Sequence, residues 1–359
     1  MYFKTVDNVR EYVEKSNIQT DQQLMILVAE KSMEDLNTLR EYLNSKNIRF
    51  FGGIYAALLV KQTSESEGFI VQKHTPIYSS VVLPYLMRFT LDKEKLQGST
   101  AIVLVDGLSA QMKELTDTVY NKIGKHVNYI GGGAGFYDLK HRPCIFDNNG
   151  IYSDVLYICI VKEHVELAVE HGWNKLKGPF KVTKSHGNVL SELDGENAFE
   201  VYKDIIEDVL DIRLSPEGFF IYAKDHPFGI LQENQLDVLV RDPIFINENN
   251  EIVCVADIPQ DSKLYVLQGN TTTLLDSSIQ ISNRCLKNAP AQYIPLLFDC
   301  ISRAMFLEEK FEKELSNIQQ RLNYMVEGAL SIGEIASGDN GELLIHNKST
   351  ILGLLQVKG

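Results

Sequence analysis

A short apolar stretch that runs into a cluster of glycines constrains this chain more than any other feature. Residues Val127 to Ile130 favour a β-strand, and Gly131, Gly132 and Gly133 follow directly. Glycine costs conformational entropy in a folded chain, so a cluster is justified where φ is positive or where a Cβ would strike a neighbouring backbone or a ligand. We therefore expect a very close approach to the backbone at these glycines.

The same order of elements occurs three times: a strand, a serine that opens a helix with one apolar face, and a second strand that ends at glycine. The apolar residues of the three helices recur at spacings of three and four, which is the period of an amphipathic helix. These helix faces consist of Leu36, Leu39 and Leu43; of Met112, Leu115, Val119 and Ile123; and of Phe311, Leu315, Ile318 and Leu322. We therefore predict three strand–helix–strand units, of which the third closes with a strand at 324–326 before Gly328.

Each unit is expected to place an N-capping serine and free helix N–H groups at the carboxyl end of a strand, where α/β sheets gather their binding sites. A single serine of this kind, or a single glycine turn, indicates only a helix cap or a turn and no binding site. Three copies together predict a shared ligand pocket. The predicted ligand-binding residues are Ser32, Gly52, Gly53, Ser109, Gly131, Gly132, Gly133, Arg241, Cys300, Ser302, Arg303 and Glu334.

Two arginines are candidates for holding a carboxylate, because a guanidinium binds that group with two parallel hydrogen bonds. Arg303 follows a strand end and opens a helix, which gives it the better position. Arg241 either clamps a ligand or forms a plain surface ion pair with Asp242. Glu334 either faces an ammonium group of the ligand or belongs to a solvated helix start.

Composition excludes several classes of partner. The net charge of −13 argues against nucleic acid, which requires a concentrated basic face. No stretch approaches the roughly 18 apolar residues of a membrane-spanning helix, and the first residues lack the apolar core of a signal peptide. We expect cytoplasmic localisation without membrane insertion. Five cysteines without C-x-x-C spacing indicate reduced thiols rather than a disulfide framework or a metal site.

The sequence favours a binding protein over an enzyme. It contains neither a G-x-S-x-G nucleophile elbow nor an H-x-x-x-H pair. The glycine cluster is not a dinucleotide fingerprint, because Phe136 and a loop with Pro143 follow it instead of a helix. An enzyme stays an alternative hypothesis: a hydrolase or transferase with Cys300 or Ser109 as nucleophile, since a cysteine at a helix start can have a lowered pKa.

The predicted fold is α/β, with mixed parallel and antiparallel sheets and helices on the outer faces. Parallel crossovers from the repeats alternate with hairpins, whose turns we place at Asn148–Gly150 and Asn247–Asn250. We expect strands at 81–90 and 155–161, a strand pair from 164 to 183, and two packed sheet layers. Two closely associated domains, residues 1–212 and 213–359, are expected to share the pocket.

Nine short pieces, in this order, resemble the N-terminal and C-terminal halves of the FIST sensory domains over nearly the whole chain. They are Phe51-Gly52-Gly53, Ile130 to Gly135, Ile145 to Gly150, His171-Gly172-Trp173, Leu193-Asp194-Gly195, Arg241-Asp242-Pro243, Phe298 to Arg303, Ser331 to Ile335 and His346 to Thr350. Singly they are weak signals, and their order makes them fairly specific. The resemblance assigns residues 1–212 to a FIST N-terminal-like domain and residues 213–359 to a FIST C-terminal-like domain.

The resemblance implies a stand-alone ligand-sensing protein of signal transduction that binds a small polar molecule, such as an amino acid or a carboxylate. Its output would pass through a separate partner protein, such as a kinase or a cyclase. Catalysis is not the usual role of the family. A scaffold without any ligand is a further alternative, and it predicts no enclosed pocket.

Some family members are described as haem-carrying gas sensors, which raises the alternative of a haem-bound nitric oxide sensor. An axial ligand is a His, Cys, Met or Tyr facing an apolar cavity. His171 is the leading candidate because it ends an apolar strand beside Trp173, and His186 and His346 are the next. Without a C-x-x-C-H motif such a haem would be bound non-covalently.

Overall fold

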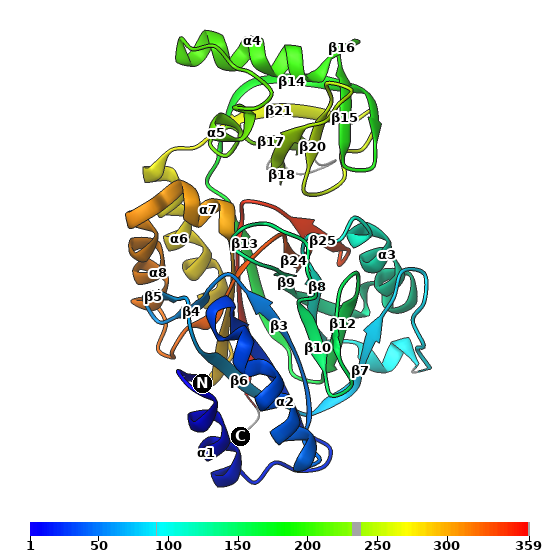
Figure 1. Ribbon diagram of the computed structural model, residues 1–359, viewed down its shortest axis with the longest axis vertical. Helices are drawn as coiled ribbons and strands as arrows, with labels where there is room; N and C mark the ends of the chain where they lie inside the picture. The colour runs from blue at the N-terminus through cyan, green and yellow to red at the C-terminus, as the bar shows by residue number, and fades with distance from the viewer. Residues whose placement is uncertain (91, 232–237, 358–359) are drawn as a thin grey trace.

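The computed structural model describes residues 1–90, 92–231 and 238–357, and it consists of two units (Figure 1). The larger unit, the three-sheet body, is formed by residues up to 170 together with those from 271 onward. The smaller unit, the β-domain, lies between 174 and 268 and carries its own sheet. The polypeptide thus leaves the body once and returns to it once.

The first sheet of the body is built on β2 (Gln23–Ala29) and β3 (Arg49–Tyr55), which run parallel on either side of α2 (Leu36–Ser45) in the chain. Strands β1 and β6 continue it beyond β2, and β10 and β11 continue it beyond β3, all in antiparallel pairing. These four are β1 (Tyr2–Phe3), β6 (Phe69–His74), β10 (Ile145–Asp147) and β11 (Ile151–Tyr152).

The second sheet repeats this plan around the parallel pair β8 (Ser99–Asp106) and β9 (Val127–Ala134), with α3 (Met112–Ile123) between them in the chain. Strands β12 and β7 extend it beyond β8, and β24 and β25 extend it beyond β9. These are β7 (Pro76–Val82), β12 (Leu156–Val161), β24 (Glu334–Ser337) and β25 (Leu343–His346).

The third sheet follows the same plan around β22 (Tyr293–Cys300) and β23 (Glu327–Ser331), with α7 (Ile301–Leu307) and α8 (Phe311–Gln319) between them. Strands β26 and β13 extend it beyond β22, and β4 and β5 beyond β23. These are β4 (Leu58–Val60), β5 (Thr63–Glu65), β13 (Val165–Glu170) and β26 (Thr350–Gln356). Strands from both halves of the chain therefore share the second and third sheets, and the three predicted repeats form three parallel pairs.

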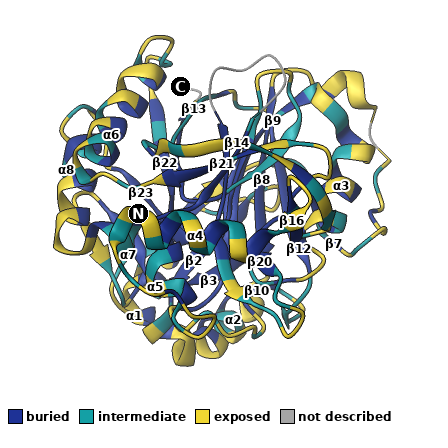
Figure 2. Cartoon of the chain, turned by 90° about the horizontal axis from the view of Figure 1, so that it is seen from above, coloured by how far each residue is buried: buried dark blue, intermediate teal, exposed yellow. Residues whose placement is uncertain are grey.

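One hydrophobic core joins the three sheets, because side chains of β2, β8 and β22 belong to the same buried cluster. The prediction of two packed sheet layers is therefore wrong, since three sheets contribute to this core. Helices cover the outer faces: α2 and α1 (Val6–Lys15) on the first sheet, α3 on the second, and α8 and α6 (Thr271–Leu286) on the third. Figure 2 shows the buried strands inside a ring of helices with exposed outer faces. The predicted apolar faces of α2, α3 and α8 are buried, and Leu322 is buried beyond the end of α8.

The glycines that were expected to end the second strand of each repeat lie within the strands instead. Gly52, Gly131 and Gly328 are equivalent, since each is paired with a residue of the neighbouring parallel strand in the same way. A Cβ at these three positions would lie 1.9, 1.7 and 1.7 Å from the carbonyl oxygen of that paired residue. The strands continue through glycine because any side chain would strike the adjacent strand.

The three serines are not helix N-caps. Ser32 lies inside the 3-10 helix η1 (Glu30–Asp35), and its hydroxyl accepts a hydrogen bond from the N–H of Gly68. Ser109 precedes α3 by three residues and accepts from the N–H of Gln111. Ser302 is the second residue of α7, and Cys300 stands at the cap position. The predicted helix starts were correct to within a few residues, but the predicted N-capping role of the three serine hydroxyls was wrong.

Three local predictions are also corrected, and the hairpins are confirmed. The strand expected at 324–326 begins later, at Glu327, and the one expected at 81–90 ends at Val82 on the edge of its sheet. Strands β13 and β14 (Asn174–His186) do not pair with each other, because β13 pairs with β26, and β14 pairs with β21 (Lys263–Gln268) and β15 (Val189–Leu193). The hairpins β10–β11 and β19–β20 (Pro243–Ile246 and Ile252–Cys254) are present as predicted.

The β-domain is an eight-stranded antiparallel sheet with a separate hydrophobic core. The predicted boundary near residue 212 falls inside this unit, after its helix α4, and stays a prediction. The helices and strands are β14 (Asn174–His186), β15 (Val189–Leu193), β16 (Glu196–Asn197), α4 (Ala198–Leu210), α5 (Phe219–Ala223), β17 (Phe228–Leu231), β18 (Val238–Arg241), β19 (Pro243–Ile246), β20 (Ile252–Cys254) and β21 (Lys263–Gln268).

The observed architecture confirms the predicted α/β class with mixed sheets and outer helices. Among the helices of the described residues, none has the length and apolar character that crossing a membrane requires.

Candidate functional site

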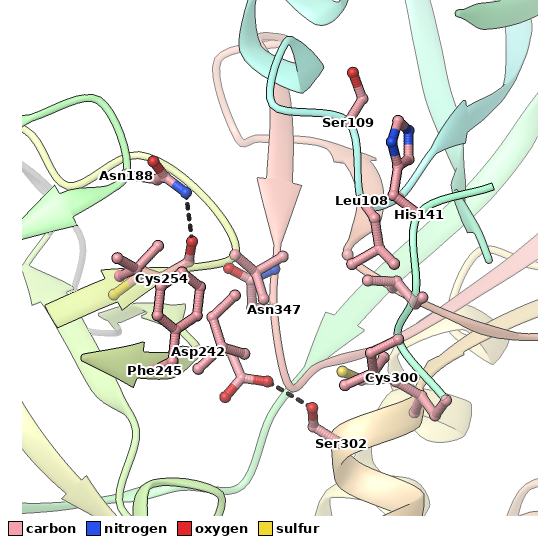
Figure 3. Close-up of a pocket in the computed structure, with 18 of the residues that line it drawn as sticks. Leu108, Ser109, His141, Asn188, Asp242, Phe245, Cys254, Cys300, Ser302 and Asn347 are labelled. Carbon is pink, nitrogen blue, oxygen red and sulfur yellow. Dashed lines mark hydrogen bonds between the residues drawn. The ribbon is translucent and has the colours of Figure 1, made fainter. Parts of the chain in front are cut away.

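A cavity of about 540 Å³ lies between the three-sheet body and the β-domain. Its walls come from the segments that follow β8 and β22, from the turn before β24, and from strands β19 and β20 of the β-domain (Figure 3). Most of the surface is apolar, with Leu108, Ile244, Phe245, Val253, Ile301 and Ile332 among the lining residues. A cavity of this size, with apolar walls and a few polar groups, is typical of small-molecule sites.

Glycine allows three chain segments to meet beneath this cavity. A Cβ on Gly133 would lie 2.0 Å from the carbonyl oxygen of Ile332 and 2.7 Å from the Cα of Gly107. The amide of Gly133 donates to Gly333, and that of Ile332 donates to Gly133. The close approach expected at the glycine cluster is present, and the turn before β24 makes it. Backbone therefore occupies the space in which a ligand was expected.

On the body side, Ser109 and His141 line the cavity and belong to a network with two aspartates. His141 Nε2 lies 2.8 Å from Asp106 Oδ2 and 3.6 Å from Asp154 Oδ1. Ser109 Oγ donates to Asp154 Oδ1 across 2.7 Å, and the N–H groups of Leu108 and Asp154 donate to Asp106. Asp106 is buried at the carboxyl end of β8, and these bonds compensate the burial of its charge.

The same network contains the residues that could hold a metal ion. One ligand atom each of Asp106, His141 and Asp154 lies within 4.8 Å of the others. Imidazole nitrogen with carboxylate oxygen suits ions such as zinc, iron or manganese. Hydrogen bonds among these groups already engage them, so the arrangement is also complete as a polar network.

On the opposite wall, Asp242 is buried and is held from the body side. Ser302 Oγ donates to its Oδ2 across 2.5 Å, and Lys348 Nζ lies 3.0 Å from its Oδ1. Lys348 is completely buried, donates to the carbonyl oxygen of Lys224, and lies 5.3 Å from the ring centroid of Trp173. The ammonium group is thus enclosed beneath the cavity and compensates the buried carboxylate.

Asn347 also lines the cavity, and its side-chain oxygen lacks a hydrogen-bond partner in the described part of the chain. The residue is 1% exposed, and its Oδ1 has no hydrogen-bond partner among the described residues. An unpaired buried acceptor costs about 1–3 kcal/mol, so a donor is expected there. The neighbouring Asn188 differs, because its Nδ2 donates to the carbonyl oxygen of Cys254 across 2.7 Å.

Cys300 lines the cavity floor, and its environment opposes ionisation of the thiol. Burial, with the carboxyls of Glu334 and Asp242 nearby, raises the pKa of Cys300 well above its usual value. Burial also raises the pKa of Glu334, although Ser331 Oγ and the N–H of Ser349 donate to its carboxyl group. This direction is opposite to the lowered thiol pKa that the Cys300 nucleophile hypothesis requires. Ser109, the other proposed nucleophile, donates its hydrogen bond to a carboxylate rather than to a histidine.

The structure brings three of the twelve predicted ligand-binding residues together at the cavity: Ser109, Cys300 and Ser302. The other nine do not line it: they are Ser32, Gly52, Gly53, Gly131, Gly132, Gly133, Arg241, Arg303 and Glu334. Glu334 is fully buried in β24, not at a solvated helix start.

Neither arginine is placed to clamp a carboxylate in this cavity. Arg303 is fully buried, and its guanidinium is engaged by Glu314 at 2.8 Å, by Ser277 Oγ and by the carbonyl oxygens of His171 and Leu274. Arg241 donates to the carbonyl oxygens of Val240, Asp257 and Ile345. Arg241 therefore ties the β-domain to the body instead of forming the surface ion pair with Asp242.

The three histidines proposed as haem ligands do not converge on a space that fits haem. His186 is exposed at the end of β14. His171 and His346 line a cavity of about 180 Å³, which is below the roughly 300 Å³ at which small-molecule sites begin. Burial lowers the pKa of His346 to about 3, and Nδ1 of His171 accepts from the N–H of Trp173. These residues do not fit a haem group in this structure.

Sequence reasoning missed His141, Asn188 and Asn347, and it named Asp242 only as the partner of Arg241. The pieces Arg241-Asp242-Pro243 and His346 to Thr350 contain two of these residues, so a signal was present without a role. His141 lies in a loop between strands with no recognisable pattern. Only the folded chain brings it to Asp106.

Comparison with known families covers most of the chain. The FIST N domain matches residues 4–196, and the FIST C domain matches residues 198–337. No curated protein matches the sequence. FIST domains are small-ligand sensing domains of signal transduction. The two adjacent matches confirm the resemblance drawn from the short pieces, and the chain belongs to the FIST family.

Proposed function

We propose that this protein senses a small molecule that binds in the cavity between the three-sheet body and the β-domain. The observation that carries the proposal concerns Asn347, which lines an apolar cavity of about 540 Å³ and whose buried Oδ1 lacks a partner within the described residues. A ligand with a hydrogen-bond donor would satisfy this oxygen.

The polar groups favour a ligand that carries an amino group and an apolar portion. Asn347 and Asp242 both line the cavity, and Asn347 Oδ1 is an acceptor without a partner in the described chain. The arginines that could have held a simple carboxylate are engaged elsewhere. An amino acid with an apolar side chain meets these requirements, with its ammonium group near Asn347 and its side chain against the apolar wall. A carboxylic acid without an amino group fits less well.

Binding across the two units provides a route to an output. The β-domain is joined to the body through two connections, near residues 171–173 and 269–270, and the cavity lies between the two units. A ligand that contacts both walls stabilises the orientation in which both contacts are made. We propose that a separate signalling partner, such as a kinase or a cyclase, reads this orientation.

A thermal-shift screen of amino acids, simple amines and organic acids tests the proposal. A ligand present at about 100 times its dissociation constant stabilises the folded protein by about 2.7 kcal/mol. We expect compounds with an amino group to raise the melting temperature and matched acids without one to have less effect. An unchanged melting temperature with every amino compound, at millimolar concentrations, would contradict the proposed function.

The variant Asn347→Leu removes the unpaired acceptor while keeping a side chain of similar shape. We expect it to fold and to lose most of the ligand-induced shift. Asn121→Leu is the matched control, because Asn121 is exposed on α3 and does not line the cavity. Retention of the full shift in Asn347→Leu would reject the assigned site even if a ligand were found.

A further inference from the structure

A second cavity, of about 640 Å³, lies at the border between the first and second sheets. It is lined by the start of β3, the turn between β10 and β11, strand β7 and the start of β12. It has no lining residue in common with the cavity proposed above. Whatever it binds is therefore independent of the proposed function.

Two arginines line this second cavity. Arg49, the first residue of β3, donates from Nη2 to Ser79 Oγ across 3.1 Å, and Arg88 also lines the space. The chain as a whole carries a net charge of −13, so most of its surface repels anions. Two arginines in the lining of one cavity form a local exception, and guanidinium groups bind carboxylate and phosphate oxygens well.

One carboxylate lines the same cavity and offsets part of this positive charge, but the two arginines outnumber it. Asp147 is the acidic residue in the described lining, and its Oδ1 accepts from the N–H groups of Asn149 and Gly150 and from Tyr152 Oη. These bonds belong to the turn between β10 and β11. The carboxylate thus holds the turn, and the charged residues of the lining keep a positive balance.

Gln23 supplies an independent indication of a ligand. It is 2% exposed at the start of β2, lines the cavity, and donates from Nε2 to Tyr157 Oη across 2.7 Å. Its Oε1 has no partner anywhere in the described chain. Tyr157 is fixed in turn by stacking on Phe51 at a centroid distance of 4.5 Å. A rigidly held, buried acceptor without a donor is costly unless a ligand provides the donor.

Apolar side chains complete the lining. Val81 and Val155 lie on the strand side, and Leu83 and Leu86 come from the turn after β7. Leu83 and Leu86 are 44% and 55% exposed, so their side chains are accessible to a ligand at the rim of the cavity. The cavity therefore offers an anion-binding side, one acceptor and an apolar rim.

We propose that this second cavity binds a small organic anion, a carboxylate or phosphate monoester, that also carries an apolar ring and an N–H or O–H donor. Arg49 and Arg88 bind the anionic group, Gln23 Oε1 accepts from the donor, and Leu83 and Leu86 contact the ring. The protein then has two binding sites of opposite preference, one for an amino compound and one for an anion.

Isothermal titration calorimetry with 4-aminophenyl phosphate tests this site, because that compound combines an anion, a ring and an N–H donor. We expect saturable binding at a single site. Arg49→Gln and Arg88→Gln should each weaken it about tenfold, as expected for one charge-assisted contact. Arg213→Gln, an equal charge change at an exposed arginine of the β-domain, should leave it unchanged. Absence of saturable binding, or equal loss in Arg213→Gln, would overturn the proposal.

Two further comparisons resolve the chemistry. Phenyl phosphate lacks the amino group, so it should bind the native protein more weakly than 4-aminophenyl phosphate does. The two compounds should bind Gln23→Leu with equal affinity. 4-Aminobenzoate shows whether the site accepts a carboxylate in place of a phosphate. Asn347→Leu should leave all three titrations unchanged. A loss of binding in Asn347→Leu would place the anion in the other cavity and reject this site.

Discussion

Ser302 Oγ donates a 2.5 Å hydrogen bond to Asp242 Oδ2, and this contact joins the first turn of α7 to the residue between β18 and β19. Ser302 belongs to the three-sheet body and Asp242 to the β-domain. Lys348 Nζ lies 3.0 Å from the other carboxylate oxygen, so the β-domain presents a buried carboxylate to a hydroxyl and an ammonium group of the body. The pairing fixes the wall of the cavity against its floor.

Lys348→Met should therefore destabilise the protein by about 3–5 kcal/mol, because it leaves the carboxylate of Asp242 buried without its counter-charge. The change in the free energy of unfolding is measured by urea denaturation. Asp242→Asn combined with Lys348→Met removes both charges and should recover part of the loss. A single-variant loss below about 1 kcal/mol, or no recovery in the double variant, would show that the pair is not held as described.

Gly131→Ala should be severely destabilising, by more than about 3 kcal/mol, because the new Cβ would lie 1.7 Å from the carbonyl oxygen of Val103. The strand pair β8–β9 would have to separate to admit it. Gly218→Ala is the control: the nearest atom to its added Cβ is 3.7 Å away, and its φ of −91° is open to alanine. Thermal unfolding of both variants measures the difference. Equal melting temperatures would contradict the packing of the parallel pair.

The repeated units could be predicted because their signals are local. Periodic apolar residues mark α2, α3 and α8, and Gly52, Gly131 and Gly328 mark the neighbouring strands. The close approach at the glycines could be predicted too, but not the groups that make it, which are a carbonyl group of the paired strand and a turn distant in sequence. The order of the strands in the sheets could not be predicted either, because β24 pairs with β9 although about 200 residues separate them in the sequence.

The candidate site was predictable only where a functional residue follows a strand end in sequence. Ser109, Cys300 and Ser302 satisfy this condition, and all three line the cavity. Arg303 satisfies this condition as well, but its side chain is buried in the core, where it forms ion pairs with Glu314 and Asp299. Ser302 and Arg303 are neighbours in α7, yet Ser302 lines the cavity and Arg303 is buried in the core. Sequence spacing near a helix start does not show which of two neighbouring residues faces a cavity.

The stability of the protein should fall in mild acid through His74. Burial, together with the positive amino terminus of Met1, lowers the pKa of His74 to about 4. The unfolded chain takes up this proton near pH 6.5, whereas the folded protein takes it up only near pH 4. The unfolded state thus binds more protons between these values, and the free energy of unfolding decreases as the pH falls through this window.

This contribution amounts to about 2–3 kcal/mol between pH 7 and pH 4.5. Urea denaturation at several pH values measures it, and His74→Leu should show a correspondingly smaller decrease. His186→Gln, at an exposed histidine, should retain the slope of the native protein. Other groups also titrate in this range, so the comparison between variants isolates His74. Parallel pH profiles for the native protein and His74→Leu would reject this assignment.

Cys300 should react slowly with iodoacetamide at neutral pH. The thiolate is the reactive form, and burial with two neighbouring carboxyl groups holds the pKa of Cys300 well above its usual value. We expect alkylation slower than that of a free thiol such as N-acetylcysteine, as followed by mass spectrometry of the peptide that contains Cys300. Mild urea should accelerate the labelling, because opening of the structure exposes the sulfur.

A ligand in the cavity should slow this labelling further, since Cys300 lines the cavity floor. Cys254 lines the opposite wall, and burial also raises its pKa, so it serves as an internal comparison on the β-domain side. Protection of both thiols by an amino compound that also raises the melting temperature would place that compound between the two units. Fast labelling of Cys300 without urea would instead show an activated thiolate and reopen the hypothesis of a cysteine nucleophile.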